Sequence, residues 1–241
     1  CFGSAPSGFR SCPGTLPTNG WNALEPSSLA SRIRSGAPAQ FERHPRRDLM
    51  VAAVGLAVVV LCMFVVRNGD VGSIEQAAFN VINGLPDWLE APMWVFQIFG
   101  SLVFIAVVAL AAVAIRRYRL GLALIAAIPL KLAFEWWGVK ALVERERPAF
   151  TVPDAVIRDV NTSPLGFPSG HAIFAFALAG LLAPYLGRRG TVIVYLLAVL
   201  NGFARVYLGA HNPLDVIAGA ALGIAIAAGL NLAVGIPAVS E

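Results

Sequence analysis

Residues 49–66 read LMVAAVGLAVVVLCMFVV, an unbroken run of apolar side chains without a single charge. A run of this length is close to the roughly 20 residues that an α-helix needs to cross a hydrocarbon core of about 30 Å. The run is continuous and does not alternate between apolar and polar residues, so it does not match a strand of a membrane β-barrel. The stretch therefore predicts a membrane-spanning helix.

Five further apolar runs follow along the chain. The six predicted spans are 49–66, 93–115, 120–138, 172–187, 191–209 and 213–234. If these were buried helices of a soluble all-α protein, six uncharged runs would leave almost no polar surface. We therefore expect an all-α, polytopic membrane protein built as a bundle of six transmembrane helices.

The composition agrees with residence in a membrane. Of the 241 residues, 57% are apolar and only 13% are charged, and the mean hydropathy is +0.71. Soluble domains carry about a quarter of charged residues. These values exclude a disordered chain, a secreted disulfide scaffold and a typical cytosolic enzyme. The three cysteines form neither a disulfide framework nor a metal-binding spacing.

The N-terminal 40 residues differ in kind, because they are rich in Ser, Gly, Pro and Ala and show no period. We expect a disordered cytoplasmic tail over 1–45, followed by one membrane domain over 46–236. The sequence begins with Cys1, as a mature lipoprotein would, but that would place the tail outside the cell. We therefore expect a fragmentary or misassigned start.

The basic residues predict the orientation. With both termini in the cytoplasm, eleven of the 18 basic residues lie on the inner side, as the positive-inside rule requires. The loops 67–92 and 139–171 then face outward across the plasma membrane. In the first of them, Ser73 and Gln76 form a capping-box pattern that opens a short amphipathic helix at the outer interface.

Charges near the spans are few, and each needs a partner or a wet cavity. Lys131 and Glu135 are four residues apart, which predicts an ion pair on one helix face, with a helper role for Lys131 as the alternative. Arg205 lies about one turn from the outer end of its span and has no such neighbour. We interpret Asp154 and Asp159, in the loop 149–167 that we expect to cap a head group, as solvated charges.

Three segments converge on the predicted outer face. They are KALVERERP at 140–148, PSGH at 168–171 and RVYLGAHNPLD at 205–215. Their cations Lys140, Arg147 and Arg205 can hold phosphate oxygens, the two arginines bidentately. The backbone N–H groups that open the helix after Ser169 and Gly170 form an anion seat. His171 and His211 can act as nucleophile or acid near neutral pH, and Asp215 can accept a proton from one ring nitrogen of His211.

In order and spacing, the three segments resemble the signature of the type 2 phosphatidic acid phosphatase family, which is related to the vanadium haloperoxidases. The resemblance covers roughly residues 50–234. It implies that His211 attacks phosphorus and forms a phosphohistidine, and that His171 protonates the leaving oxygen. It also implies phosphate-binding and charge-stabilising roles for Lys140, Arg147, Ser169, Gly170 and Arg205. The family usually has serine where this chain has Ala204, which removes a hydrogen bond at the phosphate.

The resemblance predicts a lipid phosphatase that acts at the outer leaflet without metal or other cofactor. Its substrate would be a polyprenyl diphosphate, phosphatidic acid or phosphatidylglycerol phosphate. The alternatives are a phosphotransferase that uses the same phosphohistidine, a vanadium haloperoxidase, and a transporter or structural membrane protein without turnover. We expect no nucleic-acid partner, and a monomer or homodimer. Gly219 and Gly223 form a small-residue pattern that we expect to pack within the chain rather than against a second subunit.

Overall fold

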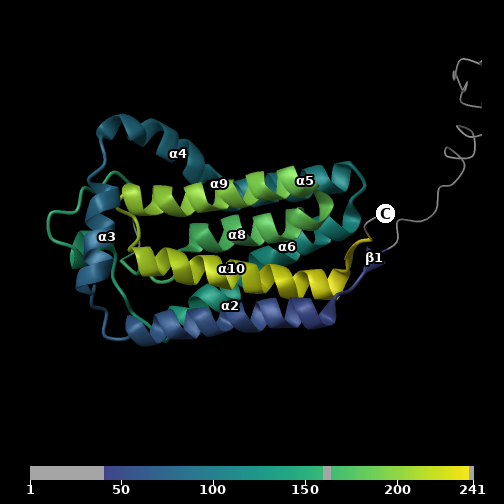
Figure 1. Ribbon diagram of the computed structural model, residues 1–241, viewed down its shortest axis with the longest axis horizontal. Coiled ribbons are helices and arrows are strands. Elements are labelled where there is room, and N and C mark those ends of the chain that lie inside the picture. Colours follow the sequence, from purple (N-terminus) through teal and green to yellow (C-terminus); the bar gives the residue numbers. More distant parts are fainter. Residues whose placement is uncertain (1–40, 160–163, 239–241) are drawn as a thin grey trace, which may run out of the picture. The chain divides into compact units, whose positions relative to one another are not determined.

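The computed structural model describes residues 41–159 and 164–238, and these residues are mostly helical (Figure 1). The α-helices are α2 (Pro45–Val65), α3 (Ser73–Asn83), α4 (Glu90–Ile98), α5 (Leu102–Ala114), α6 (Tyr118–Leu132), α7 (Pro148–Thr151), α8 (Gly170–Leu182), α9 (Arg188–Tyr207) and α10 (Pro213–Val234). Two 3₁₀ turns, Asp87–Leu89 and Ala183–Tyr185, and a π-helical segment, Ala133–Val139, extend α4, α8 and α6. Residues 1–40 of the predicted disordered tail lie outside the described residues, and the predicted boundary at 45 was wrong, because Phe41–Glu42 form a strand and α2 begins at Pro45.

The helices agree with the predicted spans in position but not in number. Four are long and apolar enough to cross a membrane: α2, α6 with its π-helical extension, α9 and α10. A fifth span is present if α4 and α5, which meet at 47°, count as one. The predicted span 172–187 corresponds to the shorter helix Gly170–Tyr185. Six spans are therefore not confirmed, although each predicted stretch contains a helix.

The predicted span 93–115 is broken into two helices. The chain leaves α4 after Ile98, and Ser101 starts α5 by accepting a hydrogen bond from the N–H of Phe104 at 3.1 Å. Asn201 of α9 stabilises the break, because its amide donates to the carbonyls of Phe96 and Gln97 at 3.1 and 3.0 Å. The same two carbonyls also accept from the backbone N–H groups of Phe99 and Gly100, at 3.3 and 3.1 Å, so the amide of Asn201 gives each a second donor at the end of α4.

Helix α10 lies between α8 and α2 and packs closely on both (Figure 1). A Cβ atom added at Gly219 would lie 2.5 Å from the carbonyl oxygen of Ser169, and one at Gly223 would lie 2.4 Å from that of Ile173. Only glycine permits such backbone approach, so the small-residue pattern packs α10 onto α8. Its expected use within the chain is confirmed.

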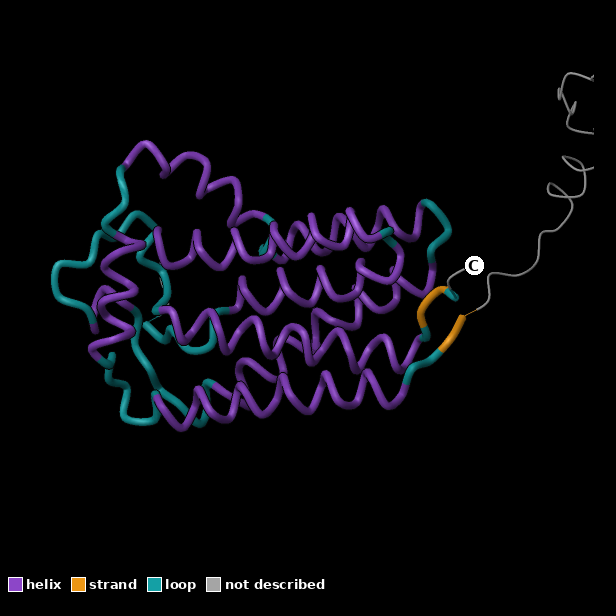
Figure 2. Tube along the Cα trace, viewed as in Figure 1, coloured by secondary structure: helices purple, strands orange, loops and turns teal. Residues whose placement is uncertain are grey.

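The two ends of the helix bundle differ. At one end, Phe41–Glu42 (β1) pairs antiparallel with Ile236–Pro237 (β2), close to the C-terminus (Figure 2). At the other end lie α3 and the long loops, teal in Figure 2. Helix α3 exposes Ile74 and buries Glu75 and Phe79. The predicted capping box of Ser73 and Gln76 is wrong, because the helix starts after Gly72 without a side-chain cap.

The loop after α7 is anchored to this second end. The guanidinium of Arg158 donates to the carbonyls of Asn83 and Tyr207 at 2.8 and 3.0 Å and pairs with Asp87 at 2.8 Å. The backbone N–H groups of Arg158 and Asp159 both donate to the carbonyl of Leu208. These bonds give Arg158 a structural role, and they hold the loop against α9.

Candidate active site

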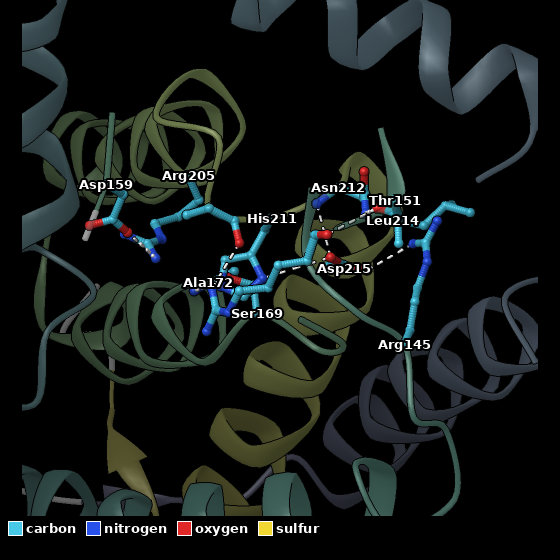
Figure 3. Close-up of polar contacts among 12 residues, drawn as sticks. Arg145, Thr151, Asp159, Ser169, Ala172, Arg205, His211, Asn212, Leu214 and Asp215 are labelled. Carbon is cyan, nitrogen blue, oxygen red and sulfur yellow. Dashed lines mark hydrogen bonds and ion pairs between the residues drawn. The ribbon is translucent and has the colours of Figure 1, made fainter. Parts of the chain in front are cut away.

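The three sequence motifs meet at the end of the bundle that carries α3. The first motif forms the loop between the π-helical segment and α7, the second opens α8, and the third runs from the last turn of α9 to the first turn of α10. Figure 3 shows His211 between the Arg205–Asp159 pair on one side and Asp215 with Arg145 on the other. The eight residues predicted for the site therefore lie in one region.

His211 is 2% exposed and lies in the connection between α9 and α10. Its Nε2 atom is 3.3 Å from Nη1 of Arg147, which also donates to the carbonyl of Ala210 at 2.8 Å. Since a guanidinium only donates, this contact favours a neutral ring with its lone pair on Nε2 and its proton on Nδ1. Burial, then the charges of Arg205 and Arg147, lowers the pKa of His211 well below its ordinary value. The ring is therefore neutral at pH 7.

Asp215 lies behind this ring, on the first turn of α10, and is fully buried. Its Oδ2 atom is 3.7 Å from Nδ1 of His211 and accepts from the backbone N–H of Asn212 at 2.9 Å. The predicted neighbours are thus side by side, but 3.7 Å is longer than a hydrogen bond. The other carboxylate oxygen, Oδ1, accepts from Nη1 of Arg145 at 2.8 Å.

Arg205 reaches the site from the last turn of α9 and is 2% exposed. It pairs with Asp159 at 2.9 Å and also donates to the side-chain oxygen of Gln97 on α4. The interpretation of Asp159 as a solvated charge was therefore wrong, because a buried guanidinium needs a counter-charge and the loop supplies it. Asp154 is exposed, as expected.

Two lysines share one carboxylate on the other side of the site. Lys131 pairs with Glu135, which confirms the predicted contact, and Nζ of Lys140 lies 2.8 Å from Oε1 of the same residue. Gly170 packs directly on this cluster, since an added Cβ atom would lie 2.8 Å from Nζ of Lys131. The cluster therefore places two cations beside the start of α8.

The start of α8 is built as an N-terminal cap. Ser169 is the N-cap residue, its hydroxyl lies 3.5 Å from the N–H of Ala172, and its own N–H donates to the carbonyl of Asp215 at 2.9 Å. Burial, then the charge of Arg205, lowers the pKa of His171, in the first turn, to about 2, so this ring is neutral at pH 7 while the site holds no anion. Helices α8 and α10 both begin here, and the positive ends of their dipoles favour an anion.

Arg147 remains a cation in spite of its burial. Burial, then the neighbouring charge of Arg205, lowers its pKa to about 10, so the guanidinium is charged at neutral pH.

Ala204 lies in an apolar cluster with Met93, Tyr207 and Leu208. The position where the family usually has serine is therefore surrounded by hydrocarbon in this chain.

The sequence did not predict the roles that four residues have in the site: Arg145, Glu75, Gln97, and Glu135 as the partner of a second lysine. Arg145 bridges Asp215 and Glu75, Glu135 holds a second lysine, and Gln97 binds Arg205. The pattern ERERP did contain a signal, since it places two arginines two residues apart next to a proline. Gln97 and Glu75 lie far from the motifs along the chain, so no spacing pointed to them. In the described residues, no three His, Cys, Asp or Glu side chains come together as metal ligands would.

Comparisons with known proteins agree on one family. The family model described as the PAP2 superfamily matches residues 118–235. The candidate undecaprenyl-diphosphatase YbjG of Escherichia coli is 31% identical over 169 residues, which cover 63% of this chain and 78% of that protein. Phosphatidylglycerophosphatase B of Bacillus subtilis is 34% identical over 96 residues, 36% of this chain and 44% of the relative.

The fold is shared with a solved structure. The crystal structure of a transmembrane PAP2-type phosphatidylglycerolphosphate phosphatase from Bacillus subtilis aligns with a TM-score of 0.62 at 22% identity, over 75% of this chain and 94% of that one. The chain spans less than half the length of the first curated relatives that it matches. Because the identity to the solved structure is only 22%, that likeness concerns the fold alone.

Proposed function

We propose that this chain, which belongs to the PAP2 superfamily, hydrolyses a lipid phosphate or diphosphate through a phosphohistidine on His211. One observation carries the proposal: a neutral, buried histidine lies among buried cations at the end of an apolar bundle, where two helices begin. Such a site suits a phosphate group better than a neutral ligand, because its cations require negative charge.

The cations are arranged to receive that charge. Arg147, Arg205, Lys140 and Lys131 approach from three sides, and two of their present partners are the carboxylates of Glu135 and Asp159. A phosphate can take over these contacts without exposing any cation to hydrocarbon. The same groups then stabilise the additional charge that develops on the equatorial oxygens in the transition state.

The first chemical step is attack by Nε2 of His211 on phosphorus. When Arg147 turns from Nε2 to a phosphate oxygen, the nitrogen lone pair becomes available. The N–P bond forms as the bond between phosphorus and the leaving oxygen breaks. His171, which takes up a proton when the charge of the bound phosphate offsets the neighbouring cations, gives this proton to the leaving oxygen. A water molecule then attacks the phosphohistidine, the neutral His171 takes a proton from this water, and inorganic phosphate leaves His211.

Asp215 supports this step from behind the ring. Its Oδ2 atom faces the protonated Nδ1 of His211 at 3.7 Å, and a small rotation of the imidazole closes a hydrogen bond. The carboxylate then holds the tautomer that presents Nε2 and compensates the positive charge that the ring acquires. No metal or other cofactor takes part in the proposed reaction.

The substrate class follows from the bundle and from the relatives. A headgroup phosphate at the end of membrane helices is reached by a lipid whose chain remains in the bilayer. Relatives are named for phosphatidylglycerophosphate and undecaprenyl diphosphate. The basic residues favour a plasma membrane protein with both termini in the cytoplasm and the site at the outer leaflet. A phosphotransferase remains the alternative, since an acceptor hydroxyl can replace water at the phosphohistidine.

The test is phosphate release in detergent from a panel of prenyl and glycerolipid phosphates, with EDTA present. We expect inorganic phosphate from at least one lipid, at a rate that EDTA does not change. Inactivity on the whole panel would overturn the proposed activity, and loss of activity in EDTA would overturn metal independence. Recovery of a phosphorylated acceptor in place of inorganic phosphate would identify a transferase.

A further inference from the structure

Behind the proposed nucleophile, Asp215 is linked to two further buried charges, Arg145 and Glu75, to which the sequence motifs assign no role. Arg145 is completely buried, and its Nη1 atom donates to Oδ1 of Asp215 at 2.8 Å. The same guanidinium binds both carboxylate oxygens of Glu75, at 3.0 and 2.6 Å. Glu75 in turn accepts from the backbone N–H of Leu214 at 2.9 Å. The right-hand side of Figure 3 shows Arg145 beside Asp215.

We propose that Arg145 and Glu75 are positioning residues that set the orientation and the charge of Asp215, and through it of His211. The inference rests on the proposed function, because it concerns the same nucleophile. Neither residue reaches the phosphate region itself: Arg145 faces Asp215 from the side opposite the ring, and Glu75 belongs to α3. They act only through the carboxylate.

The contacts leave Asp215 no freedom to turn. One of its oxygens is held by Arg145 and the other by the N–H of Asn212, so the direction of Oδ2 toward Nδ1 of His211 is determined. The bonds of Glu75 to Arg145 and to the N–H of Leu214 connect α3 to the same turn of α10. The carboxylate that supports the nucleophile is therefore fixed by its own helix start and by two sequence-distant segments, the loop with Arg145 and helix α3.

The charges also require this arrangement. Asp215 is 0% and Glu75 8% exposed, and two buried carboxylates so close together repel unless a cation lies between them. Arg145 is that cation, and its two-sided contact needs the planar guanidinium rather than a lysine ammonium. Without it, one of the two acids must take up a proton, and a protonated Asp215 cannot compensate a positive His211.

The experiment compares kcat and KM for the best lipid phosphate among wild type, Arg145→Met, Arg145→Lys and the double variant Arg145→Met with Glu75→Gln. The double variant removes the repulsion between the two acids and keeps one buried carboxylate. We expect it to recover the thermal stability that Arg145→Met loses, while its kcat stays about a hundredfold below wild type with KM within about threefold. The kcat of Arg145→Lys should lie between those of wild type and Arg145→Met.

Arg158→Met is the matched control, because this arginine, in the loop after α7, also binds α3, but its guanidinium contacts Asn83, Tyr207 and Asp87 rather than Asp215. It should lower thermal stability and keep kcat. The inference is overturned if Arg145→Met has the kcat of wild type, or if the double variant recovers kcat together with stability. A wild type that is inactive on every lipid phosphate would instead refute the proposed function, so the two failures are distinguishable.

Discussion

Replacing Gly219 by alanine adds one methyl group where α10 meets the start of α8. The new Cβ atom would lie 2.5 Å from the carbonyl oxygen of Ser169, while ordinary contact begins at 3.4 Å. The first turn of α8, which carries Gly170 and His171, must therefore move by about 0.9 Å, the difference between these distances. A displacement of about 1 Å lowers a catalytic rate about a hundredfold. We expect kcat for the lipid phosphate to fall by this factor, with about 1–3 kcal/mol of stability lost through overpacking.

Two alanine variants on the same helix serve as controls in the phosphate-release assay. At Gly229 nothing lies within 4 Å of an added Cβ atom, so Gly229→Ala should match wild type. At Gly223 the added atom would lie 2.4 Å from the carbonyl oxygen of Ile173, one turn further from the motif. Gly223→Ala should lose similar stability but less activity. If Gly219→Ala keeps the kcat of wild type, the start of α8 does not hold catalytic groups in place.

Three further predictions concern the charges around the phosphate. Burial and the nearby arginines lower the pKa of both histidines in the free enzyme, so the ring of His211 stays neutral as the pH falls below the usual value of about 6.5. In the complex with substrate the phosphate charge raises the pKa of His171, so kcat should follow a bell whose acid limb lies below about pH 6.5. A flat kcat profile from about pH 5 to about pH 9 would argue against two histidines in opposite protonation states. Gln97→Ala removes an acceptor of Arg205. Because a hydrogen bond to a charged group contributes about 1.5–3 kcal/mol, kcat/KM should fall about tenfold or more. Unchanged kinetics would show that Gln97 does not orient Arg205. Glu135→Gln leaves two buried lysines without their carboxylate and should lower the free energy of unfolding by about 3 kcal/mol. Added orthovanadate, an anion, should raise the melting temperature of this variant more than that of wild type. Equal shifts would mean that the lysines do not face the anion site.

The sequence was most informative where one local pattern determines one structural property. Uncharged runs such as 49–66 predict helices because a chain in hydrocarbon must satisfy its own backbone. The spacing of Lys131 and Glu135 predicted their pair because residues four apart share a helix face. The three motifs gathered the candidate residues because each lies at a helix end, and those ends meet at one end of the bundle.

The sequence was least informative where the partner comes from a distant segment. Apolar composition alone cannot reveal that the chain breaks between Ile98 and Leu102, where the amide of Asn201 in another helix donates to two carbonyls of α4. Asp159 looked solvated for the same reason, since its partner is Arg205 of α9. The number of spans depends on whether short or bent helices cross the bilayer, and residue patterns do not determine helix length to that accuracy.

The most direct test of the account is to trap the phosphoenzyme. Wild type and His211→Ala are mixed with a lipid phosphate labelled in its phosphate group, quenched in base during turnover, and the labelled peptide is identified. We predict an alkali-stable, acid-labile phosphoryl group on His211 in wild type, and no label or phosphate release in the variant. Turnover by His211→Ala, or a label on another residue of wild type, would contradict the assignment of His211 as the nucleophile.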